Sequence, residues 1–77
     1  MDKNFNKKIG KVLREKRNEK GFSMEYIGNL LGVTKNAVSN WEHGKRSMYA
    51  ETLKEYCRIL GCSIQEVFDS MDEDTTA

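Results

Sequence analysis

Proline is absent from the 77 residues, and the chain has no internal repeats. It also lacks any apolar run near the roughly 18 to 20 residues of a membrane span, and Met1 to Asn6 is mainly polar and charged. A domain this small buries only about 60% of its unfolded surface, which leaves little room for an active-site cleft beside a core. We expect one small cytoplasmic domain with no internal linker, secretory signal or membrane anchor.

Cysteine and histidine are scarce, with two residues and one residue respectively. Cys57 and Cys62 lie five positions apart, a spacing typical of neither a zinc site nor a disulfide framework, so we expect two reduced, packed thiols. His43 has no cluster of cysteines or carboxylates at ligand spacing. Without a combination of acid, base and nucleophile, the sequence predicts a protein that is not an enzyme and has no cofactor or metal.

Charge is unevenly distributed, although the 13 basic and 12 acidic residues nearly balance overall. Residues 1–47 hold 11 Lys and Arg against 5 Asp and Glu, a net charge of +6, whereas residues 48–77 hold 2 against 7, a net charge of −5. This dipole favours a nucleic-acid partner, because phosphates attract one part while the other limits nonspecific contacts. A solvated basic helix followed by an unrelated acidic tail would give the same asymmetry.

Apolar residues recur at helical spacing in five segments, which predicts an all-α domain. The expected apolar stripes are Phe5, Ile9, Val12 and Leu13; Ile27, Leu30 and Leu31; Val38 and Trp41; Ala50, Leu53, Cys57 and Leu60; and Ile64, Val67 and Phe68.

Glycines and small polar residues lie between these segments. Gly21 and Gly32 suit the ends of the first two helices, whereas Ser23 and Thr34 are favourable caps for the second and third. We expect Val33, in the turn between them, to be buried. The third helix is predicted from about Lys35 to Glu42.

The fifth segment opens with a capping box, Ser63 to Glu66, and the acidic residues from Asp72 to Ala77 follow it without an apolar residue. We expect a domain over residues 1–71 and a flexible acidic tail over residues 72–77.

The spacing of a further set of residues resembles the pattern of a known protein family. The set is Ile9, Leu13 and Arg17; Gly21-Phe22-Ser23; Ile27; Leu31-Gly32-Val33-Thr34; Val38; Trp41-Glu42-His43-Gly44-Lys45; Thr52-Leu53; and Leu60-Gly61. From about Lys8 to Met71 the chain resembles the Cro and lambda-repressor-like (XRE-type) helix-turn-helix family of phage and bacterial regulators. The resemblance implies a compact five-helix lambda-repressor-like domain that binds double-stranded DNA, with a partly buried ion pair between Arg17 and Glu42.

The chain departs from the family pattern at three places. Met24 stands where the family usually has a glutamine that touches the DNA backbone, and Gly28 replaces the usual alanine at the helix crossing. Glycine fits that crossing but weakens a helix by up to about 1 kcal/mol. Met48 and Tyr49 replace the proline and capping residue that commonly open the fourth helix. We expect the preceding loop to be longer, looser or differently aimed.

The third helix carries polar side chains without a core role: Lys35, Asn36, Ser39 and Asn40. A lysine in the first turn opposes the helix dipole, so Lys35 contributes little to stability but suits a guanine or a phosphate. Lysine can donate to guanine, asparagine can pair with adenine, and serine can serve either base. We predict base contacts from these four residues, although polar residues are also ordinary on an exposed helix face.

Phosphate contacts are expected at helix N-termini and in the basic loop that follows the third helix, because both bind phosphate without reading sequence. The residues predicted for this role are Ser23, Thr34, His43, Lys45, Arg46 and Tyr49.

Together these features predict a sequence-specific transcription regulator, a repressor that binds a palindromic operator through the third helix. We expect a homodimer through the fifth helix, with Ile64, Phe68 and Met71 at the contact, unless these residues all serve the monomer core. The alternative function is that of an adaptor, as in antitoxin or antirepressor systems, whose basic face recruits a protein partner.

Overall fold

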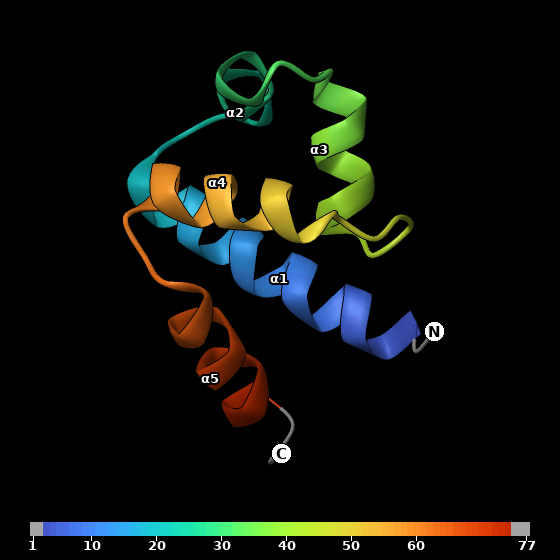
Figure 1. Ribbon diagram of the computed structural model, residues 1–77, viewed down its shortest axis with the longest axis vertical. Helices are drawn as coiled ribbons and strands as arrows, with labels where there is room; N and C mark the ends of the chain where they lie inside the picture. The colour runs from blue at the N-terminus through green and yellow to red at the C-terminus, as the bar shows by residue number, and fades with distance from the viewer. Residues whose placement is uncertain (1–2, 75–77) are drawn as a thin grey trace.

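Five helices and no strand form the described part of the computed structural model, residues 3–74 (Figure 1). They are α1 (Lys3–Lys20), α2 (Met24–Leu31), α3 (Lys35–Glu42), α4 (Ala50–Leu60) and α5 (Ile64–Asp74). Helix α1 contacts α3, α4 and α5, whereas α2 packs on α3 and α4. Helix α1 is therefore the support on which most of the domain is assembled. Within residues 3–74, none of the helices has the length and apolar character needed to cross a membrane.

Side-chain caps set the starts of three helices at the predicted positions. The Ser23 hydroxyl accepts a hydrogen bond from the Tyr26 amide at 3.0 Å, and the Thr34 hydroxyl accepts from the amide three residues later at 3.1 Å. At the start of α5, the Glu66 amide donates to the Ser63 hydroxyl at 3.1 Å and the Ser63 amide donates to the Glu66 carboxylate at 3.2 Å. These bonds satisfy amides that have no partner within their helix.

The turn between α2 and α3 brings two backbones very close together. Gly32 adopts the left-handed conformation with φ of 73°, and the Val33 amide donates to the Gly28 carbonyl at 2.8 Å. A Cβ atom on Gly28 would lie 2.7 Å from the Val33 carbonyl oxygen. Glycine is thus more than a tolerated replacement for alanine here, because in this turn a methyl group would force the backbones apart.

A second close approach, which the sequence analysis did not identify, joins α1 to the end of α3. Gly10 is buried, and a Cβ atom on it would press on the Trp41 carbonyl oxygen and lie 2.5 Å from that of Glu42. Gly44, with φ of 73°, lies equally close to Lys7. The first half of α1 therefore runs directly against the C-terminal end of α3.

The core differs from the predicted stripes at several positions. Leu30 is 52% exposed, Phe5 42% and Phe68 37%, and Val33 is only half-buried. Leu30 is not on the buried face of α2, because Ile27 and Gly28 form that face of this short helix. Phe5 and Phe68 pack against each other, with ring centroids 6.3 Å apart, beyond the edge of the core.

Helix α5 continues to Asp74, three residues past Met71, where we expected it to end. Met71 is 7% exposed and belongs to the core, so its burial anchors the turn that carries the acidic residues. Residues 75–77 lie outside the described residues, and the flexibility of the tail stays a prediction.

The two cysteines are free thiols at the junction of α4 and α5. Cys57 is buried in the core and Cys62 is half-buried against it. Burial, and then the neighbouring Cys62 thiol, raise the pKa of Cys57 to about 12. Cys57 therefore stays protonated at neutral pH, as expected of a packed thiol.

The Gly10 contact predicts the effect of a single methyl group. Gly10→Ala should gain up to about 1 kcal/mol in helix propensity, yet it should lower the free energy of unfolding by about 1 to 3 kcal/mol through overpacking against α3. Urea denaturation measures the net change. The control is Glu19→Ala at an exposed position of the same helix, which should change stability little. A Gly10→Ala protein as stable as the wild type would contradict the close packing.

Candidate nucleic-acid interface

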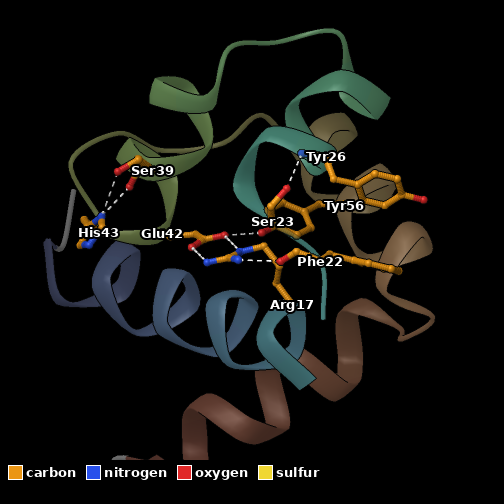
Figure 2. Close-up of polar contacts among 8 residues, drawn as sticks. All are labelled: Arg17, Phe22, Ser23, Tyr26, Ser39, Glu42, His43 and Tyr56. Carbon is orange, nitrogen blue, oxygen red and sulfur yellow. Dashed lines mark hydrogen bonds and ion pairs between the residues drawn. The ribbon is translucent and has the colours of Figure 1, made fainter. Parts of the chain in front are cut away.

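A buried carboxylate fixes the end of α3. Glu42, 2% exposed, accepts two hydrogen bonds from the Arg17 guanidinium, from Nε at 2.7 Å and from Nη2 at 3.0 Å (Figure 2). Arg17 also donates from Nη1 to the Phe22 carbonyl at 2.7 Å, and the Tyr56 hydroxyl donates to Glu42. One cluster therefore ties α3 to α1, to the α1–α2 connection and to α4. The ion pair implied by the family resemblance is present, and Tyr56 adds a partner to it.

The buried cluster shifts the protonation equilibria of its members. The hydrogen bond to Glu42 raises the pKa of Arg17, which keeps the guanidinium charged despite its burial. Burial, and then the hydrogen bond to Glu42, raise the pKa of Tyr56 far above its ordinary value. The sequence analysis missed Tyr56, although its spacing from Leu53 and Leu60 places it on the buried stripe of α4.

The outward face of α3 carries two rows of polar side chains, since residues three or four apart are neighbours on a helix. Lys35 and Ser39 form one row, and Asn36 and Asn40 form the other. Lys35 and Asn36 are exposed, whereas Ser39 and Asn40 are half-buried. His43, the residue after α3, extends the first row by one turn. The four predicted base-reading residues thus share one face, opposite the buried Val38.

A groove of about 500 Å³ separates this face from the loop that joins α3 to α4. Asn36 and Asn40 line one side, and Arg46 and Tyr49 line the other. Tyr49 is 85% exposed and caps α4 without a side-chain hydrogen bond. The Asn6 amide group donates to the Ser47 hydroxyl at 2.9 Å, which holds the loop against α1. The residues that replace the usual proline and cap thus border this groove.

The predicted phosphate-binding residues fall into two groups. The groove is lined by Thr34, Arg46 and Tyr49, whereas Ser23, His43 and Lys45 lie outside it. The Ser23 and Thr34 hydroxyls each already accept a hydrogen bond as helix caps. They keep a hydroxyl hydrogen to donate, so capping and phosphate binding are compatible.

Met24, which departs from the family pattern, has a packing role. It is half-buried and packs against the core. Because a thioether is at most a weak acceptor, Met24 stabilises α2 without supplying the hydrogen bonds of a glutamine.

The sequence profile of the helix-turn-helix family matches residues 13–67, which include the whole of α2, the turn and α3. The chain belongs to this family. Its relatives are helix-turn-helix transcription regulators, and the family resemblance identified from the sequence is confirmed.

Two relatives illustrate the similarity. The chain is 33% identical over 64 residues to the transcriptional regulator PuuR of Escherichia coli (strain K12), and the alignment covers 83% of this chain and 35% of that regulator. It is 33% identical over 55 residues to the SPbeta prophage-derived regulator YonR of Bacillus subtilis (strain 168), covering 71% of this chain and 51% of YonR. The chain therefore spans between a third and a half of these relatives.

A solved structure has the same arrangement of helices. The clp gene regulator ClgR from Corynebacterium glutamicum superimposes with a TM-score of 0.86 at 25% identity, over 90% of this chain and 73% of that chain. The predicted all-α fold of five helices is confirmed.

The buried cluster predicts strong coupling between Arg17 and Glu42. Arg17→Ala or Glu42→Ala alone should cost roughly 3 to 5 kcal/mol in the free energy of unfolding, because each leaves its partner buried without a counter-charge. The double variant should cost clearly less than the sum of the two. A double-mutant cycle in urea measures the coupling, and additive effects would contradict the cluster.

The raised pKa of Tyr56 predicts a loss of stability in alkali. Unfolding lets this phenol ionise near pH 10, whereas the folded state keeps it protonated. Its contribution is therefore present below about pH 10 and falls by up to about 1.4 kcal/mol per pH unit above it. Tyr56→Phe should flatten this part of the pH profile, whereas the exposed Tyr49→Phe should leave it as in the wild type. Equal profiles for both variants would show that Tyr56 is not the group responsible.

Proposed function

We propose that this protein is a sequence-specific transcription repressor that inserts α3 into the major groove of a palindromic operator. The observation that carries the proposal is the polar outer face of α3, which has no packing role and whose helix is anchored from behind by the Glu42 cluster. An α-helix fits the major groove, where each base pair presents its own pattern of donors and acceptors. We propose that the protein acts in the cytoplasm, where the DNA of a prokaryotic cell lies.

The asparagines and the lysine are the proposed readers of sequence. Asn36 and Asn40 can each pair bidentately with adenine, and Lys35 can donate to guanine. Ser39 lies between Lys35 and His43, where its hydroxyl can serve either base. Because Met24 packs against the core, the specificity would depend on these four α3 residues more than on α2.

The groove beside α3 is the proposed path of one DNA strand. Arg46 and Tyr49 line it opposite the asparagines, and Thr34 marks the N-terminus of α3. A phosphate held at this end would meet both the positive end of the helix dipole and a guanidinium. Ser23 at the start of α2 and Lys45 in the loop would hold neighbouring phosphates.

Two copies are proposed to bind together, with recognition helices about 34 to 36 Å apart so that they enter successive major grooves. Met71 is buried, and Ile64 packs against the monomer core, so these two residues contribute little to a contact between copies. Phe68 packs against Phe5 with the rings tilted, and both residues are exposed. The proposed dimer contact is therefore centred on these two phenylalanines.

The competing function is that of an adaptor that recruits a protein. The salt dependence of the binding affinity distinguishes the two functions. A protein that makes 6 to 10 phosphate contacts loses roughly 10³ to 10⁵ in affinity between 50 and 200 mM salt. A protein partner bound on the basic face releases no counterions condensed on DNA, so its affinity falls far less over that range.

Selection of bound sites from random DNA tests sequence reading. The wild type should enrich one palindromic sequence, and Asn36→Ala or Asn40→Ala should each cost about 1 to 3 kcal/mol and relax the preference at one position. Lys45→Ala should weaken binding to every sequence to a similar degree. If the wild type enriches no sequence, the proposed reading by α3 is wrong.

The dimer contact predicts a change in oligomeric state. Phe68→Glu should shift the protein from dimer toward monomer in sedimentation, and it should weaken operator binding by removing the second half-site contact. Leu30→Glu changes a more exposed apolar residue on α2 and should leave the dimer intact. A wild type that sediments as a monomer with and without operator DNA would rule out the dimer.

A further inference from the structure

One ring nitrogen of the His43 imidazole is hydrogen-bonded within the protein. Its Nδ1 lies 2.8 Å from the Ser39 carbonyl oxygen, and the Ser39 hydroxyl lies 3.3 Å from the same nitrogen (Figure 2). A carbonyl oxygen can only accept a hydrogen bond, so Nδ1 carries a hydrogen. This holds whether the ring is neutral or charged.

The bond to Ser39 leaves Nε2 as the position that gains or loses a proton. In the neutral ring Nε2 has a lone pair and can only accept, so it has no hydrogen to offer a phosphate oxygen. After protonation the same nitrogen donates, and the ring carries a positive charge. A histidine ring makes this change between about pH 5 and 8.

The position of His43 makes the change relevant to DNA. The residue is exposed and continues the row of Lys35 and Ser39 by one turn, which places it at the C-terminal end of the proposed reading face. From this position the ring can reach the DNA strand that borders the major groove, where phosphates rather than base edges lie.

The charged groups around His43 are mainly basic. Lys7 of α1 lies against Gly44, the next residue, and Lys45 and Arg46 follow in the loop. Lys11 lies one turn further along α1 and Lys35 two turns back along α3. The carboxylate of Glu42 is turned into the core toward Arg17 and Tyr56. These cations make the surroundings of His43 attractive to a DNA phosphate.

We propose that His43 is a proton-coupled phosphate contact, which binds the DNA backbone as an imidazolium and makes operator affinity rise as pH falls. The inference rests on the proposed function, because it names a regulation of the same DNA-binding site. It assigns separate roles within one row of side chains. Lys35 and Ser39 face bases, and His43 contacts a phosphate of the DNA strand beside them.

The test compares DNA affinity at about pH 8 and about pH 6 at constant ionic strength, using the duplex selected from random DNA. The chain has a single histidine, so one residue can be varied. Wild-type affinity should rise on acidification by up to about tenfold per pH unit for each protomer that takes up one proton. His43→Gln, which is neutral throughout, should bind weakly with a flat profile. His43→Lys, which is charged throughout, should bind tightly with a flat profile.

Calorimetry in two buffers of different ionisation enthalpy gives an independent readout. Wild-type binding near neutral pH should take up protons, and both variants should take up fewer. A wild type that binds the duplex with strong salt dependence but no pH dependence would overturn the proton-coupled contact and leave the proposed function standing. Affinity that rises with pH would overturn it too, since a neutral ring would then be reading a base. A wild type that binds no DNA at either pH would refute both proposals.

Discussion

Glu42 is the residue on which the arrangement of the other parts depends. Its carboxylate is removed from water at the last position of α3, and that burial is tolerable only because Arg17 and Tyr56 supply donors to it. The three residues come from α3, α1 and α4. A helix of eight residues such as α3 is too short to be stable alone, so its orientation is set by this cluster and by the packing around it.

The glycine contacts complete the same support. Gly10 lets α1 run against the carbonyl groups at the end of α3, and Gly28 lets the turn after α2 close tightly. One end of α3 is therefore fixed by close packing and an ion pair, and the other by the Thr34 cap. The polar face between these ends takes no part in the core, so its residues can vary while the packing stays unchanged.

Local chemistry accounts for what the sequence predicted well. The caps at Ser23 and Thr34 and the bounds of α3 depend on residues a few positions apart, and the structure places them as expected. Contacts between segments that are distant in the sequence were harder to predict. Nothing next to Gly10 in the sequence indicates that α3 will lie against it. Phe5 follows the helical period of α1 but lies at the edge of the core, against Phe68 of α5. The proposed roles of the α3 side chains toward DNA are not determined by folding, because the packing of α3 depends on Val38, Trp41 and Glu42 instead.

The central claim is that the domain meets DNA through the outer face of α3 and the adjoining loop. Its most direct test is nuclear magnetic resonance of the protein titrated with the selected DNA duplex, in which the side-chain amide groups of Asn36 and Asn40 are followed individually. The account predicts large shifts for these two groups and for the backbone amides of Thr34 and Arg46, with α5 outside the dimer contact little changed. Large shifts confined to α2 or α5, with both asparagine amides unmoved, would contradict it.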